Sequence, residues 1–212
     1  MSASVPQCPA LHSADLATAV LSSATLTPED ILDLAVLGAA AEAALPVGAL
    51  PVILREIGGD AVTPTADVVA GRAADLAARG LLVEAPTLGG GALGRGTWAV
   101  ATSAAGRRHA RALMCRPGPP VDSPLGAVAD RLRLCLLDLL EPDDRGAVLA
   151  QLETARRERL GRLRRAETHC PCRHSFMRRW LAHETGRLDA ELSWIGRLAS
   201  EGGATPVLQP AS

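Results

Sequence analysis

Two thiols and two imidazoles lie within six consecutive residues, in the hexapeptide His169-Cys170-Pro171-Cys172-Arg173-His174. Thiolates beside arginines ionise more readily, and thiolates with imidazoles bind soft metal ions or undergo reversible oxidation. The one-residue gap between the cysteines is tighter than the roughly two to four residues usual in a zinc site. The hexapeptide therefore predicts either a metal- or redox-responsive site or an ordinary turn between helices. The candidate metal ligands are His169, Cys170, Cys172 and His174.

A dense run of arginines precedes this hexapeptide. Such a run can follow the phosphates of a nucleic acid. It can also form the solvated side of a paired helix, answered by Glu153, Glu158 and acids on a partner chain. The net charge of −1 provides no overall attraction to nucleic acid. The arginines are Arg156, Arg157, Arg159, Arg162, Arg164 and Arg165.

A third group of side chains, between residues 63 and 95, could contact DNA from a helix and a loop. Hydroxyls at a helix N-terminus suit a phosphate oxygen. A carboxylate can accept a hydrogen bond from a cytosine amino group or repel phosphate, and an arginine on a glycine-rich loop can reach the backbone or the minor groove. The predicted contacts are Thr63, Thr65, Asp67, Arg72 and Arg95. The alternative interpretation is a solvated helix face beside an ordinary loop.

The elements around these five residues follow the order of a winged helix. Thr63-Pro64-Thr65 opens a helix that closes at Arg79-Gly80, where glycine is an expected stop. Residues 81–85 and 97–101 read as two short strands joined by a glycine-rich turn. In a winged helix, the helix enters a DNA groove and the hairpin braces the backbone beside it. The pattern predicts a mainly α fold with a small β-hairpin wing.

Apolar residues at helical spacing cover most of the remaining chain. Residues 27–30 form a good helix start, and the apolar spacing continues from Ile31 to Leu45. A short helix is predicted near Leu50, and Ser103 can cap another that reaches Met114. Three further helices are predicted at residues 125–140, from Asp143 or Asp144 to about Thr168, and at about 175–199.

The C-terminal helices carry long apolar stripes but little core of their own, and such stripes usually bury against a second copy. The sequence therefore predicts a homodimer with an interface at Leu149, Leu152, Leu160, Leu163, Leu181, Leu188, Leu192 and Ile195. The predicted organisation is a flexible arm (1–28), a winged helix-turn-helix domain (29–115), a Pro-rich linker (116–124), a helical dimerisation domain (125–200) and a flexible tail (201–212).

The chain carries no catalytic or membrane signature. GxSxG and HExxH are absent, and the glycines at 89–91 precede no helix with a nucleotide-binding pattern, so an enzyme is not expected. The N-terminus does not resemble a signal peptide, and no apolar stretch approaches the ~20 residues that span a bilayer. Five cysteines, an odd number, do not suggest a disulfide framework. We expect a cytoplasmic protein without a cofactor, apart from the metal considered above.

The order of elements over roughly residues 30–200 resembles the PadR-like family of winged-helix transcriptional regulators. Residues 31–38 resemble the family's opening "ILGLL" helix, and Thr63-Pro64 stands where the family has Ser-Pro. Residues 75–83 resemble "LE-x-x-GLV", residues 101–107 resemble "LTPAGR", and residues 183–194 resemble the last helix of its dimerisation domain.

Two features depart from that family. Its recognition helix usually carries a tyrosine near its start, where this chain has residues 66–69, Ala-Asp-Val-Val. Its wing ends in several basic residues before two aromatics, whereas only Arg95 and Trp98 remain here. Both changes weaken the expected contacts with phosphates and bases.

The resemblance implies a dimeric regulator, most simply a repressor, that binds palindromic double-stranded DNA. An effector bound between the two halves, or at the cysteine-histidine turn, would change their relative angle and release the DNA. Two alternatives stay open. The chain could be a ligand- or partner-binding scaffold that kept the fold and lost DNA recognition, because residues 30–100 hold eight acids and four arginines. It could also be a thiol- or metal-responsive regulator.

Overall fold

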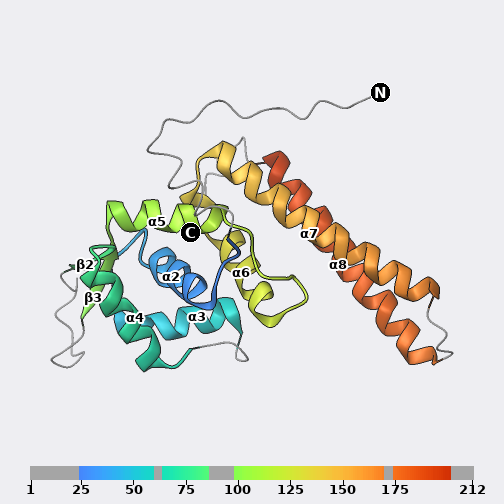
Figure 1. The fold of residues 1–212 in the computed structure, drawn as a ribbon, viewed down its shortest axis with the longest axis horizontal. Coiled ribbons are helices and arrows are strands. Elements are labelled where there is room, and N and C mark those ends of the chain that lie inside the picture. Colours follow the sequence, from blue (N-terminus) through green and yellow to red (C-terminus); the bar gives the residue numbers. More distant parts are fainter. Residues whose placement is uncertain (1–23, 60–63, 86–97, 170–173, 202–212) are drawn as a thin grey trace, which may run out of the picture.

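The structure, a computed structural model, describes residues 24–59, 64–85, 98–169 and 174–201 (Figure 1). Helices α2 to α6 pack together with a small antiparallel sheet at one edge, and two long helices, α7 and α8, extend from this part as a hairpin. The predicted mainly α fold with a β-hairpin is confirmed. None of the helices in these ranges is long and apolar enough to cross a membrane.

Helix α2 (Pro28–Ala39) begins where its sequence predicts. The Thr27 hydroxyl accepts a hydrogen bond from the Asp30 backbone N–H at 3.1 Å, and the Asp30 carboxylate accepts one from the Thr27 N–H at 2.8 Å. These reciprocal bonds form a capping box, which satisfies two backbone donors that a helix start leaves unpaired.

The expected continuation of α2 to Leu45 is wrong. The helix ends at Ala39, and Leu45–Pro46 form strand β1, which pairs with β3 (Ala99–Thr102). Thr102 of β3 donates through its hydroxyl to the Leu37 carbonyl at 2.6 Å and through its N–H to the Ala40 carbonyl at 2.9 Å. These bonds satisfy carbonyl groups at the helix end, so the sheet terminates α2 where apolar spacing alone would extend it.

The sheet has the strand order β1-β3-β2, with β2 at Leu82–Ala85. Strands β2 and β3 are the predicted wing strands, and Leu82 lies opposite Thr102 in their antiparallel register. The third strand, β1, was not expected. After it, a 3-10 turn at Val47–Ala49 leads into α3 (Leu50–Gly58).

Helix α4 (Ala66–Ala78) follows, with Thr65 at its N-cap position. Gly80 adopts a positive φ of 70°, and the N–H groups of Gly80 and Leu81 bond to the carbonyls of Ala77 and Leu76, each at 2.9 Å. This is a Schellman motif, so the glycine stop predicted from the sequence is confirmed.

Helix α5 (Ala104–Cys115) packs closely on the turn that leads into β2. Ser103 caps it by accepting from the Gly106 N–H at 3.0 Å. A Cβ atom at Gly106 would stand only 2.1 Å from the Leu81 carbonyl oxygen. Glycine at this position therefore permits an approach that any side chain would block.

Helix α6 (Pro124–Cys135) is shorter than predicted. A 3-10 turn at Leu137–Leu139 replaces its expected last turn before Leu140. Residues three apart face the same way in a 3-10 turn, and Leu137 and Leu140 are both buried. The tighter turn thus directs both leucines into the core.

Helices α7 (Pro142–His169) and α8 (Ser175–Glu201) form the antiparallel hairpin in Figure 1. Asp143 and Asp144 lie in the first turn of α7, whereas one of them was expected as its cap. Carboxylates there still favour the positive end of the helix dipole.

One hydrophobic core runs through most of the described chain. It begins at Leu26, includes the buried sides of α2, α4 and α5, and extends to Val148, Leu149 and Leu152 of α7 and Ile195 of α8. The segment 116–124, predicted as a linker, therefore joins elements that share one core.

Candidate nucleic-acid interface

Helix α4 has a buried face and an exposed N-terminal end. Val69, Ala73 and Leu76 point into the core, while Val68 is 51% exposed. Thr65 and Asp67 are exposed beside it. The structure thus gives two of the five predicted DNA contacts a common surface. The other positions are Thr63 and Arg95, which lie outside the described residues, and Arg72, which is considered below.

The start of α4 differs from the starts of α2, α5 and α6. The hydroxyls of Thr27, Ser103 and Ser123 each accept a backbone N–H of the helix that they precede. The Thr65 side chain makes no such capping bond. No hydrogen bond therefore joins the Thr65 hydroxyl to the first backbone N–H groups of α4. Uncapped N–H groups at a helix N-terminus are suited to binding a phosphate.

Arg72 does not share this surface. Its guanidinium forks onto the carboxylate of Asp33 on α2, with Nη2 2.9 Å from Oδ2. Arg79 Nη1 lies 3.4 Å from the same oxygen, and His109 Nε2 of α5 lies 3.9 Å from it. Arg72 was expected to contact DNA, but its head group is held against α2. We therefore assign Arg72 to the support of α4.

Asp33 is only 3% exposed, yet its surroundings favour the charged form. Burial by itself raises the pKa of this carboxyl group. The nearby His109, the hydrogen bonds from Arg72 and the positive charges of Arg72 and Arg79 outweigh burial and lower the pKa below 3.8. An ionised Asp33 thus ties α2, α4 and α5 together and fixes the inner side of α4.

The exposed surface near α4 is acidic in the part of the chain that the structure describes. Asp67, Asp75 and Glu84 are exposed there. Between residues 64 and 85 the basic residues are Arg72 and Arg79, and both pair with Asp33. Within residues 64–85, phosphate attraction therefore depends more on hydroxyl and backbone N–H donors than on charge.

Most arginines of the run on α7 form ion pairs with acids of the same chain. Arg156 is buried, with Nη1 3.1 Å from Asp130 Oδ2 and Nε 3.1 Å from Glu191 Oε2. Asp122 lies 2.7 Å from Arg159 and 2.5 Å from Arg162. Further along, Arg164 pairs with Asp189 at 2.9 Å and Arg157 with Glu153 at 2.6 Å. The acids that were expected on a partner chain are on this chain, which disfavours a phosphate track here.

Sequence reasoning missed the buried ionic cluster around Asp130. Burial raises the pKa of Asp130 more than the charges of Arg156 and Arg133 lower it. Arg133 donates to the Met114 carbonyl at 2.9 Å and to Gln151 at 2.6 Å. The partners lie between 18 and 35 residues apart, so no local pattern could have revealed them.

Most of the predicted dimer interface is buried within the single chain. Six of its eight residues are at most 6% exposed in one copy, so they pack between α7, α8 and the core. These side chains are already covered within one copy, and the position of a dimer interface stays a prediction. The six are Leu149, Leu152, Leu160, Leu181, Leu188 and Ile195, whereas Leu163 and Leu192 are partly exposed.

Three aromatic side chains of α8 are exposed, with the charged Arg187 on the same side of the helix. Phe176 is 78% exposed, Trp180 55% and Trp194 43%. Phe176 and Trp194 are eighteen residues apart, which is about five helical turns, and Trp180 follows about one turn after Phe176. These three residues, the aromatic stripe, therefore lie along one side of α8. The signal in the sequence was that three of its four aromatic residues fall in one helix.

The metal or thiol site stays a prediction. Cys170 and Cys172 lie outside the described residues, while His169 and His174 flank them at the helix ends. The His169 ring nitrogen Nδ1 lies 2.9 Å from the Arg165 carbonyl oxygen. In the ranges that the structure covers, no group of three or more histidine, cysteine, aspartate or glutamate residues could hold a metal ion.

PadR proteins are among the solved structures that resemble the chain, at low similarity. Bacillus subtilis PadR in complex with operator DNA has a TM-score of 0.38 and 14% identity, over 81% of this chain and 99% of that chain. The same protein in complex with p-coumaric acid has a TM-score of 0.36 and 13% identity, over 85% of this chain and 100% of that chain. No curated protein sequence matches the chain.

The family comparison covers most of the chain. Residues 21–199 match the family described as "Putative AphA-like transcriptional regulator". That range includes the winged helix, α6 and nearly all of the α7–α8 hairpin. The match confirms the predicted class, a transcriptional regulator and not an enzyme. The chain therefore belongs to the AphA-like family of putative transcriptional regulators.

Proposed function

We propose that this regulator is a cytoplasmic, DNA-binding dimer that represses transcription until an effector releases it from its operator. One observation carries the DNA-binding part of the proposal. The N-terminal end of α4 is exposed and the Thr65 side chain makes no capping bond there, while the Arg72–Asp33 pair anchors the same helix to α2. A rigid helix with free donors at its exposed end suits insertion into a DNA groove.

The charge distribution predicts how the complex responds to salt. Because Arg72 and Arg79 pair with Asp33, α4 neutralises few phosphates by charge. The salt dependence of DNA affinity scales with the number of phosphates neutralised, so we expect a shallow slope. Thr63 and Arg95 stay predicted contacts beside Thr65.

The exposed aromatic stripe of α8 supports the dimeric part of the proposal, because a second copy would cover it. Large exposed aromatic side chains along one helix are typical of an interface with another protein. A twofold pair of chains would present two α4 helices to half-sites about one helical turn of DNA apart, or a multiple of it.

Fluorescence anisotropy with the native upstream DNA, at several salt concentrations, tests the DNA-binding proposal. Thr65→Glu places a negative charge where a phosphate is expected, so DNA affinity should fall about tenfold or more. Thr154→Glu is the matched control, because Thr154 is exposed on α7, away from α4. Equal affinity of both variants and the wild type would contradict a role for this end of α4. No specific complex at low salt would reject DNA binding altogether.

The acidic surface near α4 favours a second candidate, a scaffold that binds a ligand or protein partner without DNA. Asp67 and Asp75 are exposed there, while Arg72 turns inward. Absence of any salt-sensitive DNA complex would favour this function. The thiol- or metal-responsive alternative has a separate test. A Cys170→Ser, Cys172→Ser double variant with unchanged metal content and DNA affinity would remove it.

A further inference from the structure

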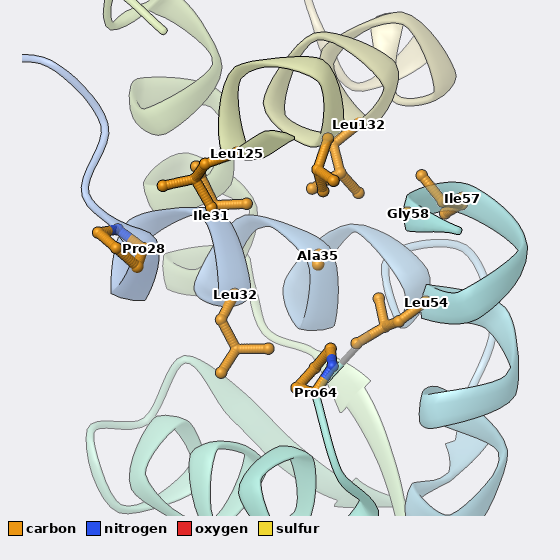
Figure 2. Close-up of a pocket in the computed structure, with 11 residues that line it drawn as sticks. Pro28, Ile31, Leu32, Ala35, Leu54, Ile57, Gly58, Pro64, Leu125 and Leu132 are labelled. Atoms are coloured by element: carbon orange, nitrogen blue, oxygen red, sulfur yellow. The ribbon is translucent and has the colours of Figure 1, made fainter. Parts of the chain in front are cut away.

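An apolar cavity of about 190 Å³ lies between α2, α3, α6 and the residue that precedes the α4 cap. Figure 2 shows α2 crossing the centre of the view, with Leu125 and Leu132 of α6 on one side and Pro64 on the other. Ile31 and Ala35 of α2 lie between them. The cavity therefore touches three helices and the start of a fourth.

The lining determines which kind of molecule fits. Every described lining residue is proline, glycine, alanine or a branched aliphatic residue, so none of these side chains can pair with a charge or a hydrogen-bonding group. A carboxylate or an amine would lose hydration there without gaining a partner, which disfavours it. An enclosed apolar cavity of about 150 Å³ stays free of water and binds benzene, and this pocket has a similar volume but is partly open to solvent. The cavity thus suits an uncharged molecule of about one ring.

The cavity walls also support the exposed end of α4. Pro64 lines the cavity and directly precedes Thr65, the N-cap residue of α4. On α6, Arg131 Nη1 lies 3.5 Å from the Ile57 carbonyl and 3.4 Å from the Gly58 carbonyl, at the end of α3. Ile57 and Gly58 are lining residues as well. A molecule between these walls would therefore contact both the end of α3 and Pro64, directly before the α4 cap.

We propose that this cavity is the effector site of the regulator, and that it takes a small, uncharged, apolar ring compound whose binding lowers DNA affinity. The inference rests on the proposed DNA-binding function for its consequence, but the binding step can be measured without DNA. By linkage, DNA should weaken the binding of the ring compound by the same factor.

The isoleucines provide a direct test in the full chain. There are four of them, and Ile31 and Ile57 line the cavity while Ile53 and Ile195 do not. With isoleucine δ1-methyl labelling, toluene should shift the Ile31 and Ile57 NMR signals in a saturable way and leave the other two nearly unchanged. Benzoate, a charged compound with the same ring, should shift neither pair. Absence of saturable shifts at Ile31 and Ile57 with toluene would overturn the proposal.

Variants with a larger side chain in the cavity test whether toluene binds there. Val128 lines the cavity on α6, so Val128→Phe should abolish the toluene shifts. Val52→Phe is the matched control, since Val52 is 56% exposed on α3 and lies outside the lining. Gly58→Leu is a second filler, because a Cβ at Gly58 would meet the Val128 methyl groups at an ordinary 3.7 and 3.8 Å. Unchanged shifts in both filled variants would place toluene elsewhere and overturn the site.

A DNA measurement separates the two proposals. Toluene should reduce the DNA affinity of the wild type by about fivefold or more, and should have no effect on Val128→Phe. If toluene binds but DNA affinity is unchanged, the effector role is overturned. If the chain binds no DNA, the proposed function fails together with the effector role, while saturable shifts at Ile31 and Ile57 would still support a ligand site.

Discussion

Asp33 connects three helices through one carboxylate. Asp33 belongs to α2. Its carboxylate accepts a hydrogen bond from Arg72 of α4 and lies 3.9 Å from His109 Nε2 of α5. A buried charge of this kind is tolerated only because several donors surround it. The position of α4 therefore depends on one residue that lies 39 positions away from Arg72 in the sequence.

Asp33→Asn should destabilise the fold, because it removes the charge that Arg72 and Arg79 face. We expect a loss of about 2 kcal/mol in the free energy of unfolding, the scale of a hydrogen bond to a charged group. Urea unfolding followed by circular dichroism measures it. Asp75→Asn is the matched control, because Asp75 is 69% exposed and 4.0 Å from Arg72, and its change should be under about 0.5 kcal/mol. Equal losses in both variants would contradict the assigned role of Asp33.

The same residue predicts a pH dependence with a defined sign. The pKa of Asp33 in the folded state lies below 3.8, the ordinary value for an aspartate in an unfolded chain, so the unfolded chain takes up the proton first as the pH falls. The stability from Asp33 is thus fully present above pH 3.8 and is lost as the pH falls through the lower folded pKa. The stability difference between the wild type and Asp33→Asn should shrink in that acid range. A difference that stays constant down to acid denaturation would contradict this.

At the scale of elements, Gly106 sets the distance between α5 and the turn before β2. A Cβ there would lie 2.1 Å from the Leu81 carbonyl oxygen and 2.9 Å from a Thr102 methyl group. Gly106→Ala should therefore destabilise the protein by about 2 kcal/mol, although alanine is the better helix former by about 1 kcal/mol.

Gly146→Ala is the control for this prediction. Gly146 lies on α7 with nothing within 4 Å of the added Cβ, so this change should leave the free energy of unfolding equal or raise it by up to about 1 kcal/mol. Thermal unfolding of the two variants gives the comparison. A Gly106→Ala protein as stable as Gly146→Ala would show that α5 can move away from the sheet.

Elements with local signals could be predicted from the sequence. The Thr27 cap, the Ser103 cap and the Gly80 stop depend on residues within one turn, and all three are confirmed. Strand β1 could not be predicted, because its two residues become a strand only by pairing with β3, more than fifty positions later. The leucine lines of α7 and α8 indicated a buried seam, but spacing alone does not tell whether the partner helix belongs to the same chain.

The candidate site likewise contains some features that the sequence predicted and others that it could not predict. The exposure of Thr65 and Asp67 agrees with the surface that the winged-helix pattern predicts for a helix start. Arg72 and the arginines of α7 form ion pairs with acids that are distant in the sequence. The sequence therefore shows the basic residues but does not show which acids they pair with. The cavity is likewise formed by three helices that meet only in the folded chain.

At the scale of the whole molecule, the aromatic stripe predicts the state of assembly. We expect the wild type to sediment as a dimer and Trp180→Glu to sediment as a folded monomer, since a carboxylate in place of this aromatic side chain would lose hydration when a second copy covers it. Val52→Glu, on an exposed apolar residue of α3, should remain dimeric. Analytical ultracentrifugation decides between these outcomes. A dimeric Trp180→Glu protein would place the interface elsewhere.

The shared core has a consequence for motion. Val148, Leu149 and Leu152 of α7 pack in the same core as α2 and α4, across the proline-rich segment 116–124. A core shared across the prolines disfavours a hinge at this segment, and we expect the base of the long hairpin to move together with α4. In the proposed dimer, adjustment to the spacing of DNA half-sites would then come from bending farther along the hairpin or from the contact between the two copies.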